Sequence, residues 1–409
     1  MRVCVMSSMF PMTSQTFVMQ HVTGLLDNDY DVNVLAHRGM EAAWESLGYY
    51  QEPLKSRVWY YQAPLNKINR IKGILSQTIH HLASGNLNYL KSMNIMRFGK
   101  SSVNLNLPYI YNTALTIQPV DILHCHFGHN GVFGAYLKRL GFAKKLVVTF
   151  HGHDVSAALQ NTTSKNIYRP VFEEADLILP VSEFWKKKLL DIGAPESRVF
   201  VHRVGIDVSQ FSYRERVASS RPLKIITTAR FVEKKGLSYA IQAVAQVKKE
   251  HPNIKFDYDI IGEGPLSEEI GCLVTSLEIS DCVKLHGALP HGEVQKLLAD
   301  ADVFILPSIK ASNGDQEGIP VSLMEAMASG MPVLSTLHSG IPELVDDGVS
   351  GYLVPERDVS ALAQKIAYLA ERPESWSKLG QAGRAKVEQD YNKEHQNNLL
   401  IGMYHNIID

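Results

Sequence analysis

Short apolar runs rich in β-branched residues recur along the chain with helical patterns between them, and this alternation constrains the fold more than any other feature. In the first half the runs are RVCVMSS (2–8), DVNVLA (31–36), DILHCH (121–126), KLVVTF (145–150), DLILPVS (176–182) and RVFVHRVG (198–205). Strands that alternate with helices build βαβ units and a parallel sheet. The first half is therefore predicted to be a doubly wound α/β domain.

The same alternation begins again after a polar linker, which predicts a second domain. Its runs are LKIITTAR (223–230), FDYDIIGEG (256–264), DVFILPS (302–308), PVLST (332–336) and GYLVP (351–355). A chain of 409 residues with 45% hydrophobic content is long and apolar enough for two cores. We predict an N-terminal domain over residues 1–205, a linker over 206–222, a C-terminal domain over 223–382 and a terminal helix over 383–409 that packs back on the N-terminal domain.

Polar residues follow directly after many of these runs, as in HCHFGHN, FHGHD, IGEGP and LPS. They therefore lie at the carboxyl ends of the predicted strands. In open α/β sheets, ligands bind at that edge, where the order of the strands switches. With two such sheets, the predicted binding site is a cleft in which the two carboxyl edges face each other.

Charge and cysteine pattern exclude several classes of function. The formal net charge of −1 provides no overall attraction to nucleic acid. The four cysteines are scattered without a C-x-x-C pair, which argues against a zinc knuckle or a disulfide framework. The start MRVCVMSSMFPM lacks a signal-peptide core, and no segment approaches the about 20 apolar residues of a membrane span. We expect a cytoplasmic protein that is soluble or peripheral to a membrane.

Residues 53–120 form the clearest local charge asymmetry, because this span holds eight Lys and Arg residues and no Asp or Glu. Aromatic residues are interleaved with the cations, and a second basic cluster follows Trp185. This combination suits an anionic membrane surface, whereas the alternative is the solvated face of an inserted helical region. RNA binding is disfavoured because no RNP or KH module accompanies the charge. The candidates for an acceptor or membrane side are Lys67, Arg70, Lys72, Lys186 and Lys187.

Two loops after predicted strands carry features typical of phosphate or nucleotide sites. Arg230 ends the run LKIITTAR, and Lys234 and Lys235 lie where the next helix opens. Cations beside a helix N-terminus suit a diphosphate, although a solvent-exposed loop has the same sequence pattern. The glycines of IGEGP (261–265) would let the backbone approach a ligand, or simply form a strand-to-helix turn.

The stretch DQEGIPVSLMEAMASG (315–330) places Glu317 and Glu325 eight positions apart around a Gly-Ile-Pro turn. A plain structural interpretation is available, since Pro is favoured at helix starts, Glu forms helices and Gly330 is a natural stop. The alternative is that both carboxylates contact one ligand.

The histidines of HCHFGHN and FHGHD raise a metal-site hypothesis, because imidazoles are common zinc ligands. The candidates are His124, His126, His129, His151 and His153. Few carboxylates lie nearby, and no H-E-x-x-H spacing occurs. We therefore predict no metal, and expect His151 to bind a substrate hydroxyl instead.

Taken in order, FHGHD, VGID, AR-FVEKKG, IGEGP, EGIPVSLMEAMASGMPV, HSGIPELV and GYLVP resemble a family 4 retaining glycosyltransferase. The spaced pair E-x7-E is the hallmark of that family. FPMTSQTF, DQEGIP and STLHSGIPELV are most similar to the bacterial exopolysaccharide enzymes of the colanic-acid and amylovoran type. The resemblance implies the GT-B fold, in which two Rossmann-like domains face each other across a cleft.

The resemblance also implies roles for individual residues. Arg230 and Lys235 would hold the diphosphate of the sugar donor and stabilise the charge that develops as it leaves. Glu317 would contact the donor sugar and Glu325 the ribose. His151 would bind the sugar near its reacting face. The remaining candidates are Asp154, Gly262, Glu263, Gly264, Gly318, Ile319 and Pro320 on the donor side, and Ser14, Gln15 and Thr16 on the acceptor side.

The implied activity is transfer of a hexose-type sugar, with retention, from a UDP-sugar to a saccharide or polyprenyl-diphosphate-linked saccharide, without a metal. The expected place is the inner face of a bacterial membrane. Two departures from the family pattern are MFPMTSQTF (9–17), where members often carry a Gly-Gly loop, and Val204, where Asn is usual. The alternatives are a sugar-nucleotide epimerase or hydrolase and a non-catalytic nucleotide-sugar-binding protein. The last is disfavoured by the combined presence of His151, Arg230, Lys235, Glu317 and Glu325.

Overall fold

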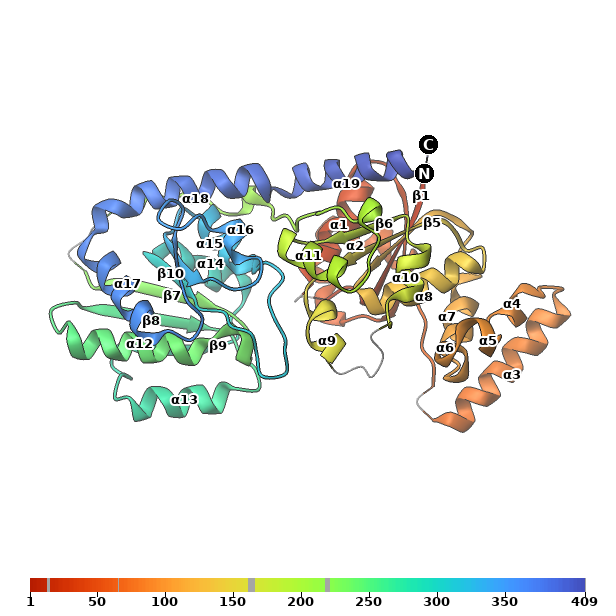
Figure 1. Ribbon diagram of the computed structural model, residues 1–409, viewed down its shortest axis with the longest axis horizontal. Coiled ribbons are helices and arrows are strands. Elements are labelled where there is room, and N and C mark those ends of the chain that lie inside the picture. Colours follow the sequence, from red (N-terminus) through yellow and green to blue (C-terminus); the bar gives the residue numbers. More distant parts are fainter. Residues whose placement is uncertain (13–14, 65, 161–165, 218–220, 409) are drawn as a thin grey trace.

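The computed structural model describes residues 1–12, 15–64, 66–160, 166–217 and 221–408. Two parallel six-stranded sheets form two domains that lie side by side along the long axis of the molecule (Figure 1). Both have the Rossmann strand order, with the crossover between the third and fourth sequential strands of the sheet. The prediction of two doubly wound domains of the GT-B type is confirmed.

The N-terminal sheet has the order β3-β2-β1-β4-β5-β6. Its strands are β1 (Arg2–Met9), β2 (Asp31–Arg38), β3 (Val58–Tyr60), β4 (Val120–His126), β5 (Ala143–Phe150) and β6 (Leu177–Pro180). The helices are α1 (Thr16–Asp27), α2 (Gln51–Lys55), α3 (Lys67–Ala83), α4 (Asn88–Lys91), α5 (Ile95–Phe98), α6 (Lys100–Val103), α7 (Asn106–Ala114), α8 (Gly128–Arg139), α9 (Ala157–Gln160), α10 (Arg169–Glu174) and α11 (Glu183–Asp191). Helices cover both faces of the sheet, so its central strands are buried along most of their length.

The C-terminal sheet has the order β12-β11-β10-β7-β8-β9. Its strands are β7 (Leu223–Thr228), β8 (Phe256–Ile261), β9 (Val283–Gly287), β10 (Val303–Leu306), β11 (Val333–Thr336) and β12 (Tyr352–Val354). Its helices are α12 (Leu237–Glu250), α13 (Ser267–Ser276), α14 (His291–Asp300), α15 (Val321–Ala328), α16 (Ile341–Leu344), α17 (Val359–Glu371) and α18 (Trp376–Asp390).

One predicted strand does not form, and two strands were not predicted. RVFVHRVG forms no strand of the sheet. Val199 makes an isolated bridge with Ile178, and the N–H groups of Phe200 and His202 donate to the carbonyls of Ile178 and Pro180 in β6 before the chain continues to the second domain. The unpredicted strands β3 and β9 are short edge strands with polar residues in or beside them, so their sequences carry little apolar pattern.

The chain crosses between the domains twice, and the two crossings lie side by side. Ile206 pairs with Asn392 in an isolated parallel bridge, beside the break between α18 and the last helix, α19 (Lys393–Ile408). Figure 1 shows α18 and α19 running along one side of the molecule from the C-terminal to the N-terminal domain. Leu400 and Tyr404 of α19 are buried in the core around β1 and α1. The C-terminal helix therefore completes the core of the first domain.

Residues 53–120 form β3 and the helices α3 to α7, with α3 at the outer end of the N-terminal domain (Figure 1). Tyr89, Phe98 and Leu107 bury this segment against the N-terminal core. The outer side of α3 instead carries an exposed apolar row, which consists of Ile68, Ile71, Leu75, Ile79 and Leu82. Within the described parts of the chain, no helix combines the length and apolarity needed to cross a bilayer.

Candidate active site

A pocket of about 570 Å³ opens between the domains at the carboxyl edges of the two sheets. The N-terminal domain supplies Phe17, Phe127 and His151 to its wall. Of the predicted site residues, the lining includes Gln15, His151, Arg230, Lys235, Glu317, Gly318, Ile319 and Pro320. The structure thus brings together side chains from loops as far apart in sequence as residues 15 and 320.

The Glu317-Gly318 turn is where the two domains touch. A Cβ on Gly318 would lie 2.6 Å from the carbonyl oxygen of His151, so any side chain there would push the domains apart. The indole Nε1 of Trp185 donates a hydrogen bond of 3.0 Å to the Glu317 carbonyl. The EGIP turn and the FHGHD turn therefore form one interface, which sequence reasoning treated as two separate motifs.

Helix α15 begins directly behind this turn, after Pro320. The first N–H groups of a helix have no partner within the helix and carry partial positive charge. Because Ile319, Pro320, Val321 and Ser322 line the pocket, this end of α15 faces it. The pocket therefore has a backbone surface suited to an anion.

Glu317 is buried and paired with Lys235. The Lys235 Nζ atom lies 2.7 Å from Glu317 Oε1, and the Ser308 hydroxyl donates to the same oxygen at 3.3 Å. Burial by itself would raise the pKa of Glu317, but the two lysines Lys235 and Lys234 lower it below its usual range. Glu317 is therefore a carboxylate that can accept hydrogen bonds from a ligand.

Beside the Lys235–Glu317 pair, an ionic contact of Asp315 links the two domains. Asp315 lies 3.1 Å from Lys234 Nζ and 3.0 Å from His153 Nδ1 of the N-terminal domain. Burial opposes ionisation of Asp315, yet the His153 hydrogen bond and Lys234 lower its pKa to about 2. The same hydrogen bond raises the pKa of His153. Both residues belong to motifs of the sequence, DQEGIP and FHGHD, but no sequence pattern indicates their contact.

Arg230 is the exposed cation of the pocket, and its guanidinium has no hydrogen-bond or ion-pair partner among the described residues. Three cations (Arg230, Lys234 and Lys235) thus face two carboxylates (Asp315 and Glu317), which leaves one net positive charge. Together with the end of α15, this surplus can stabilise a bound phosphate group.

Asp154 lies behind the pocket, outside its lining, and holds the turn that carries His151. Its carboxylate accepts hydrogen bonds from the backbone N–H groups of Gly128, His151 and Gly152 at 2.9, 3.0 and 3.0 Å. Burial raises its pKa to about 6, against the effect of these bonds. In front of it, the His151 ring lies 4.3 Å from the Phe17 ring and 4.6 Å from the Phe127 ring, measured between centroids.

The loop of Gly262, Glu263 and Gly264 also lies outside the pocket lining. Gly262 has a φ of +132°, and a Cβ there would lie 1.9 Å from the Ala229 carbonyl oxygen. The Phe231 N–H donates to the Glu263 carbonyl at 2.9 Å. These glycines thus let the loop after β8 pack against the segment that carries Arg230.

Glu325 lies one to two turns into α15 and is also absent from the pocket lining. Among the residues the structure describes, its carboxyl group has no hydrogen-bond partner, and burial raises its pKa to about 7. Near neutral pH the free protein therefore holds this group partly protonated.

Replacing Glu325 by Gln should stabilise the free protein at pH 7.5 by a few degrees in Tm. The folded state binds the Glu325 proton more tightly than the unfolded state. The contribution of Glu325 to the free energy of unfolding of the native protein therefore falls as pH rises from about 4.5 to about 7. Calorimetry should show that the gap between native protein and E325Q closes at pH 5. E269Q, at an exposed glutamate of α13, is the matched control and should show no such trend. An equal gap at both pH values would contradict the prediction.

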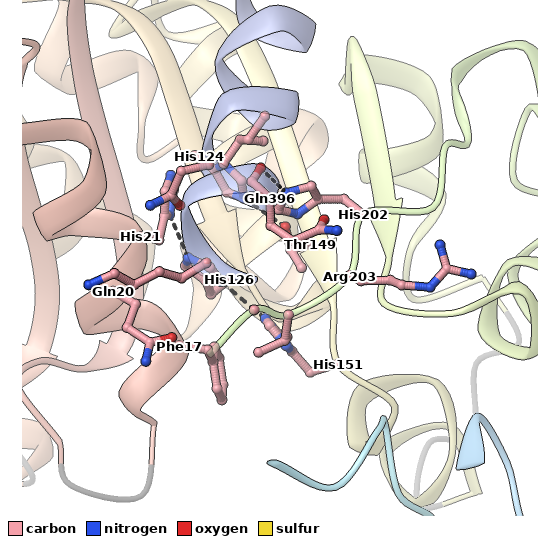
Figure 2. A pocket seen from close by; sticks show the side chains of 15 residues that line it. Phe17, Gln20, His21, His124, His126, Thr149, His151, His202, Arg203 and Gln396 are labelled. Carbon is pink, nitrogen blue, oxygen red and sulfur yellow. Dashed lines mark hydrogen bonds between the residues drawn. The ribbon is translucent and has the colours of Figure 1, made fainter. Parts of the chain in front are cut away.

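The histidines of the metal-site hypothesis separate in the structure. His129 contacts the Ser8 hydroxyl at 2.7 Å, and His153 contacts Asp315. His124 and His126 instead meet His21, which sequence analysis did not single out. Figure 2 shows these rings around a cavity of about 40 Å³ that also borders His151, His202 and Gln396.

The predicted acceptor and membrane residues do not form one group. Gln15 lines the pocket and Thr16 begins α1, whereas Ser14 lies outside the described residues. Lys186 and Lys187 lie on α11, well apart from α3 in Figure 1. Arg70 is partly buried, and its guanidinium donates to the carbonyls of Pro64 and Asn104. Only Lys67 and Lys72 are exposed lysines or arginines on α3. The apolar row of the same helix was not predicted.

Comparison with known proteins adds sequence evidence to this geometry. The family model described as Glycosyltransferase Family 4 matches residues 14–210, and the one described as Glycosyl transferases group 1 matches residues 209–386. Over 403 residues the chain is 38% identical to the putative colanic acid biosynthesis glycosyltransferase WcaL of Escherichia coli (strain K12), covering 96% of this chain and 97% of the relative. It is 37% identical over 396 residues to the amylovoran biosynthesis glycosyltransferase AmsK of Erwinia amylovora, covering 96% of each chain.

The fold also matches solved structures. The crystal structure of Anabaena Alr3699/HepE in complex with UDP and glucose superposes with a TM-score of 0.74, covering 99% of this chain and 100% of that one. At 18% sequence identity, this likeness concerns the fold.

Proposed function

The chain belongs to the family 4 glycosyltransferases of the exopolysaccharide type, and from this we propose that it transfers a hexose-type sugar from a UDP-sugar to a saccharide acceptor with retention of configuration. The observation that carries the proposal is the interdomain pocket, which combines the cation Arg230, unpaired within the described chain, the N-terminus of α15 and the buried carboxylate of Glu317. An anionic, hydroxyl-rich ligand fits this combination. UDP is favoured as the nucleotide because HepE, of the same fold, was crystallised with UDP-glucose.

In the proposed complex, Arg230, Lys235 and the N-terminus of α15 hold the diphosphate. Glu317 accepts hydrogen bonds from sugar hydroxyls. Glu325 binds the ribose hydroxyls after the nucleoside has displaced the groups that now bury the Glu325 carboxyl group. Gly262, Glu263 and Gly264 border the nucleoside. His151 binds the sugar beside its reacting carbon.

The mechanism we propose rests on electrostatic stabilisation of the leaving group. As the bond from the anomeric carbon to the phosphate breaks, negative charge grows on the diphosphate, next to Arg230 and Lys235. The acceptor hydroxyl oxygen then bonds to the anomeric carbon on the face that the phosphate leaves, and its proton passes to an oxygen of the departing phosphate, which gives retention. Because these cations and the backbone amides at the start of α15 neutralise the charge of the diphosphate, the reaction requires no metal ion.

A second pocket, of about 490 Å³, is the proposed acceptor site. It lies at the carboxyl ends of β1 and β2, and its lining includes His37, Arg38, Arg70 and His129. Two arginines suit the diphosphate of a polyprenyl-linked saccharide. Arg70 belongs to α3, so this pocket adjoins the helix with the exposed apolar row.

We propose that the apolar row of α3 docks on an anionic membrane surface. Its five side chains are 49 to 68% exposed, and Lys67 and Lys72 lie on the same helix without acidic neighbours in residues 53–120. A helix with an apolar stripe and flanking cations lies in the headgroup region of anionic bilayers. The basic cluster of Lys186 and Lys187 lies on a different surface, and is not needed for this docking.

Replacing Leu75 and Ile79 together by Glu should lower binding to vesicles with anionic lipid at least tenfold. Two apolar side chains no longer contact the bilayer, and two negative charges are added that the lipid repels. Turnover of a water-soluble acceptor should stay unchanged. The matched control is Ser76→Glu with His80→Glu, which adds the same charge on exposed positions of α3 outside the row. Equal losses in the two double variants would show that charge alone matters, and unaltered binding in both would refute the docking surface.

A panel of nucleotide-sugars read by thermal shift tests the donor, because a bound ligand stabilises the folded state. We expect a UDP-sugar to give the largest shift. Release of UDP should then require a saccharide acceptor and persist in EDTA. Donor consumption without acceptor would favour an epimerase or hydrolase, and binding without release under any acceptor would favour a non-catalytic protein.

A further inference from the structure

A continuous line of hydrogen bonds runs through the buried part of the N-terminal domain to His151. It joins side chains from β5, β4, α19 and α1, and part of it is drawn in Figure 2. The five links are Thr149 Oγ1 to His124 Nε2 (2.7 Å), His124 Nδ1 to Tyr404 Oη (2.5 Å), Tyr404 Oη to His21 Nε2 (3.0 Å), His21 Nδ1 to His126 Nε2 (2.9 Å) and His126 Nδ1 to His151 Nε2 (3.0 Å). We call these six residues the histidine relay.

The histidines of the relay are neutral. His21, His124 and His126 are at most 6% exposed, and burial, reinforced by the neighbouring imidazoles, lowers their pKa values well below the usual range. Burial lowers the pKa of His151 to about 3. A neutral imidazole has one N–H donor and one acceptor nitrogen. Each link of the relay therefore dictates the direction of the next.

Thr149 sets that direction. Its hydroxyl is buried, and its one hydrogen bond to a described residue is the contact with His124 Nε2. A buried hydroxyl hydrogen without an acceptor is costly, so Thr149 donates to His124. His124 then donates from Nδ1 to Tyr404, and Tyr404 donates to His21. His21 donates from Nδ1 to His126, and His126 donates from Nδ1 to His151 Nε2.

We propose that Tyr404, through this relay, is a positioning residue that holds His151 with its proton on Nδ1, so that the ring presents an N–H donor to the interdomain pocket. His151 lines both the cavity of the relay and the pocket, and its Nδ1 has no partner among the described residues. The ligand class it suits is an uncharged oxygen acceptor, such as a sugar hydroxyl. The effect on turnover rests on the proposed function, whereas the tautomer does not.

A metal ion does not explain the cluster as well. Ligand atoms of His21, His124 and His126 lie within 4.8 Å of one another, as a metal would require. However, His21 Nδ1 and His126 Nε2 are only 2.9 Å apart, whereas two imidazoles on a tetrahedral zinc ion place their nitrogens about 3.3 Å apart. All six ring nitrogens of the three histidines have hydrogen-bond partners within the relay. The geometry is therefore that of hydrogen bonding.

The test is ¹⁵N NMR of the full-length protein labelled on histidine, with the His151 signals assigned from H151Q. In the native protein, Nδ1 of His151 should be protonated and Nε2 should not. Tyr404→Phe removes the central link and should convert this single tautomer to a mixture. Tyr30→Phe is the matched control, because it removes another tyrosine contact to α19, the 3.0 Å bond to His405, without touching the relay.

A second pair of variants distinguishes an effect on the relay from a folding defect. Thr149→Val removes the first donor of the relay without a change in volume, and should also give mixed tautomers, whereas Thr149→Ser should keep Nδ1–H. With a donor and an acceptor that support turnover, Y404F and T149V should lower kcat about 10-fold to 100-fold with much less effect on the KM of the sugar donor. Protonated Nε2 in the native protein, or an unchanged His151 spectrum in both variants, would overturn the proposal. So would stoichiometric zinc that is lost in H21Q.

Discussion

Replacing Arg230 by Ala should lower kcat by about 10²-fold to 10³-fold and leave thermal stability unchanged. The guanidinium is exposed and has no partner in the described chain, so its removal leaves no buried charge behind. In the proposed mechanism, its interaction strengthens as charge grows on the diphosphate. Losing one such preorganised group typically costs about 10²-fold to 10³-fold in kcat. Among the residues of the pocket, Arg230 therefore offers the cleanest test of the diphosphate role.

The measurement is UDP release at saturating donor and acceptor, together with calorimetric binding of UDP. Arg230→Lys should give an intermediate rate, because it keeps the charge but loses the bidentate fork. Arg97→Ala, which removes an exposed arginine of the N-terminal domain far from the pocket, is the control and should be unaffected. If UDP affinity fell while kcat stayed unchanged, Arg230 would contribute only uniform binding, and its role on the leaving diphosphate would be contradicted.

The architecture and much of the pocket could be predicted because their signals are local. Apolar runs separated by helical patterns indicate parallel strands, and polar residues after those runs mark the carboxyl edge. Arg230 closely follows β7, and Lys235 and Glu317 lie shortly before α12 and α15; all three line the pocket. Their convergence follows from the topology of the two sheets, which the alternation of elements indicates.

The relay could not be predicted, because its members meet only through tertiary packing. His21 and Tyr404 lie 383 positions apart and belong to helices without any catalytic motif. Each would read by itself as a core residue. The position of Asp154 has a similar explanation, since a carboxylate after a strand fits equally well as a ligand-binding group and as an acceptor for backbone N–H groups of its own turn.

The exposure of the apolar row of α3 could not be predicted for a third reason. Its residues recur at helical spacing, which ordinarily indicates a face turned to the core. The buried face of α3 is instead provided by Ile74 and His81, and the row points to solvent. Sequence periodicity shows that a helix has an apolar face, but not what covers that face.

Lys235→Ala should combine a loss of kcat of about 10³-fold with a marked loss of stability. Lys235 stabilises the leaving diphosphate in the proposed mechanism, and it is also the counter-ion of Glu317, whose side chain is 7% exposed. Removing one partner of a buried ion pair leaves an uncompensated charge, which costs about 3–5 kcal/mol. The pKa of Glu317 is lowered in the folded protein, so this contribution is complete above the unfolded pKa and is lost as pH falls through the folded one. The destabilisation should therefore be large at pH 7 and smaller at pH 4.

A double variant separates the two roles of Lys235. Adding Glu317→Gln to K235A removes the unpaired carboxylate, so stability at pH 7 should return while kcat stays low. The control is Lys248→Ala, which breaks the exposed pair with Asp281 and should cost less than about 1 kcal/mol. Thermal unfolding at pH 7 and pH 4 gives the stabilities, and UDP release gives the rates. If the double variant regained activity together with stability, Lys235 would act only through Glu317, and the diphosphate would depend on Arg230 and the end of α15.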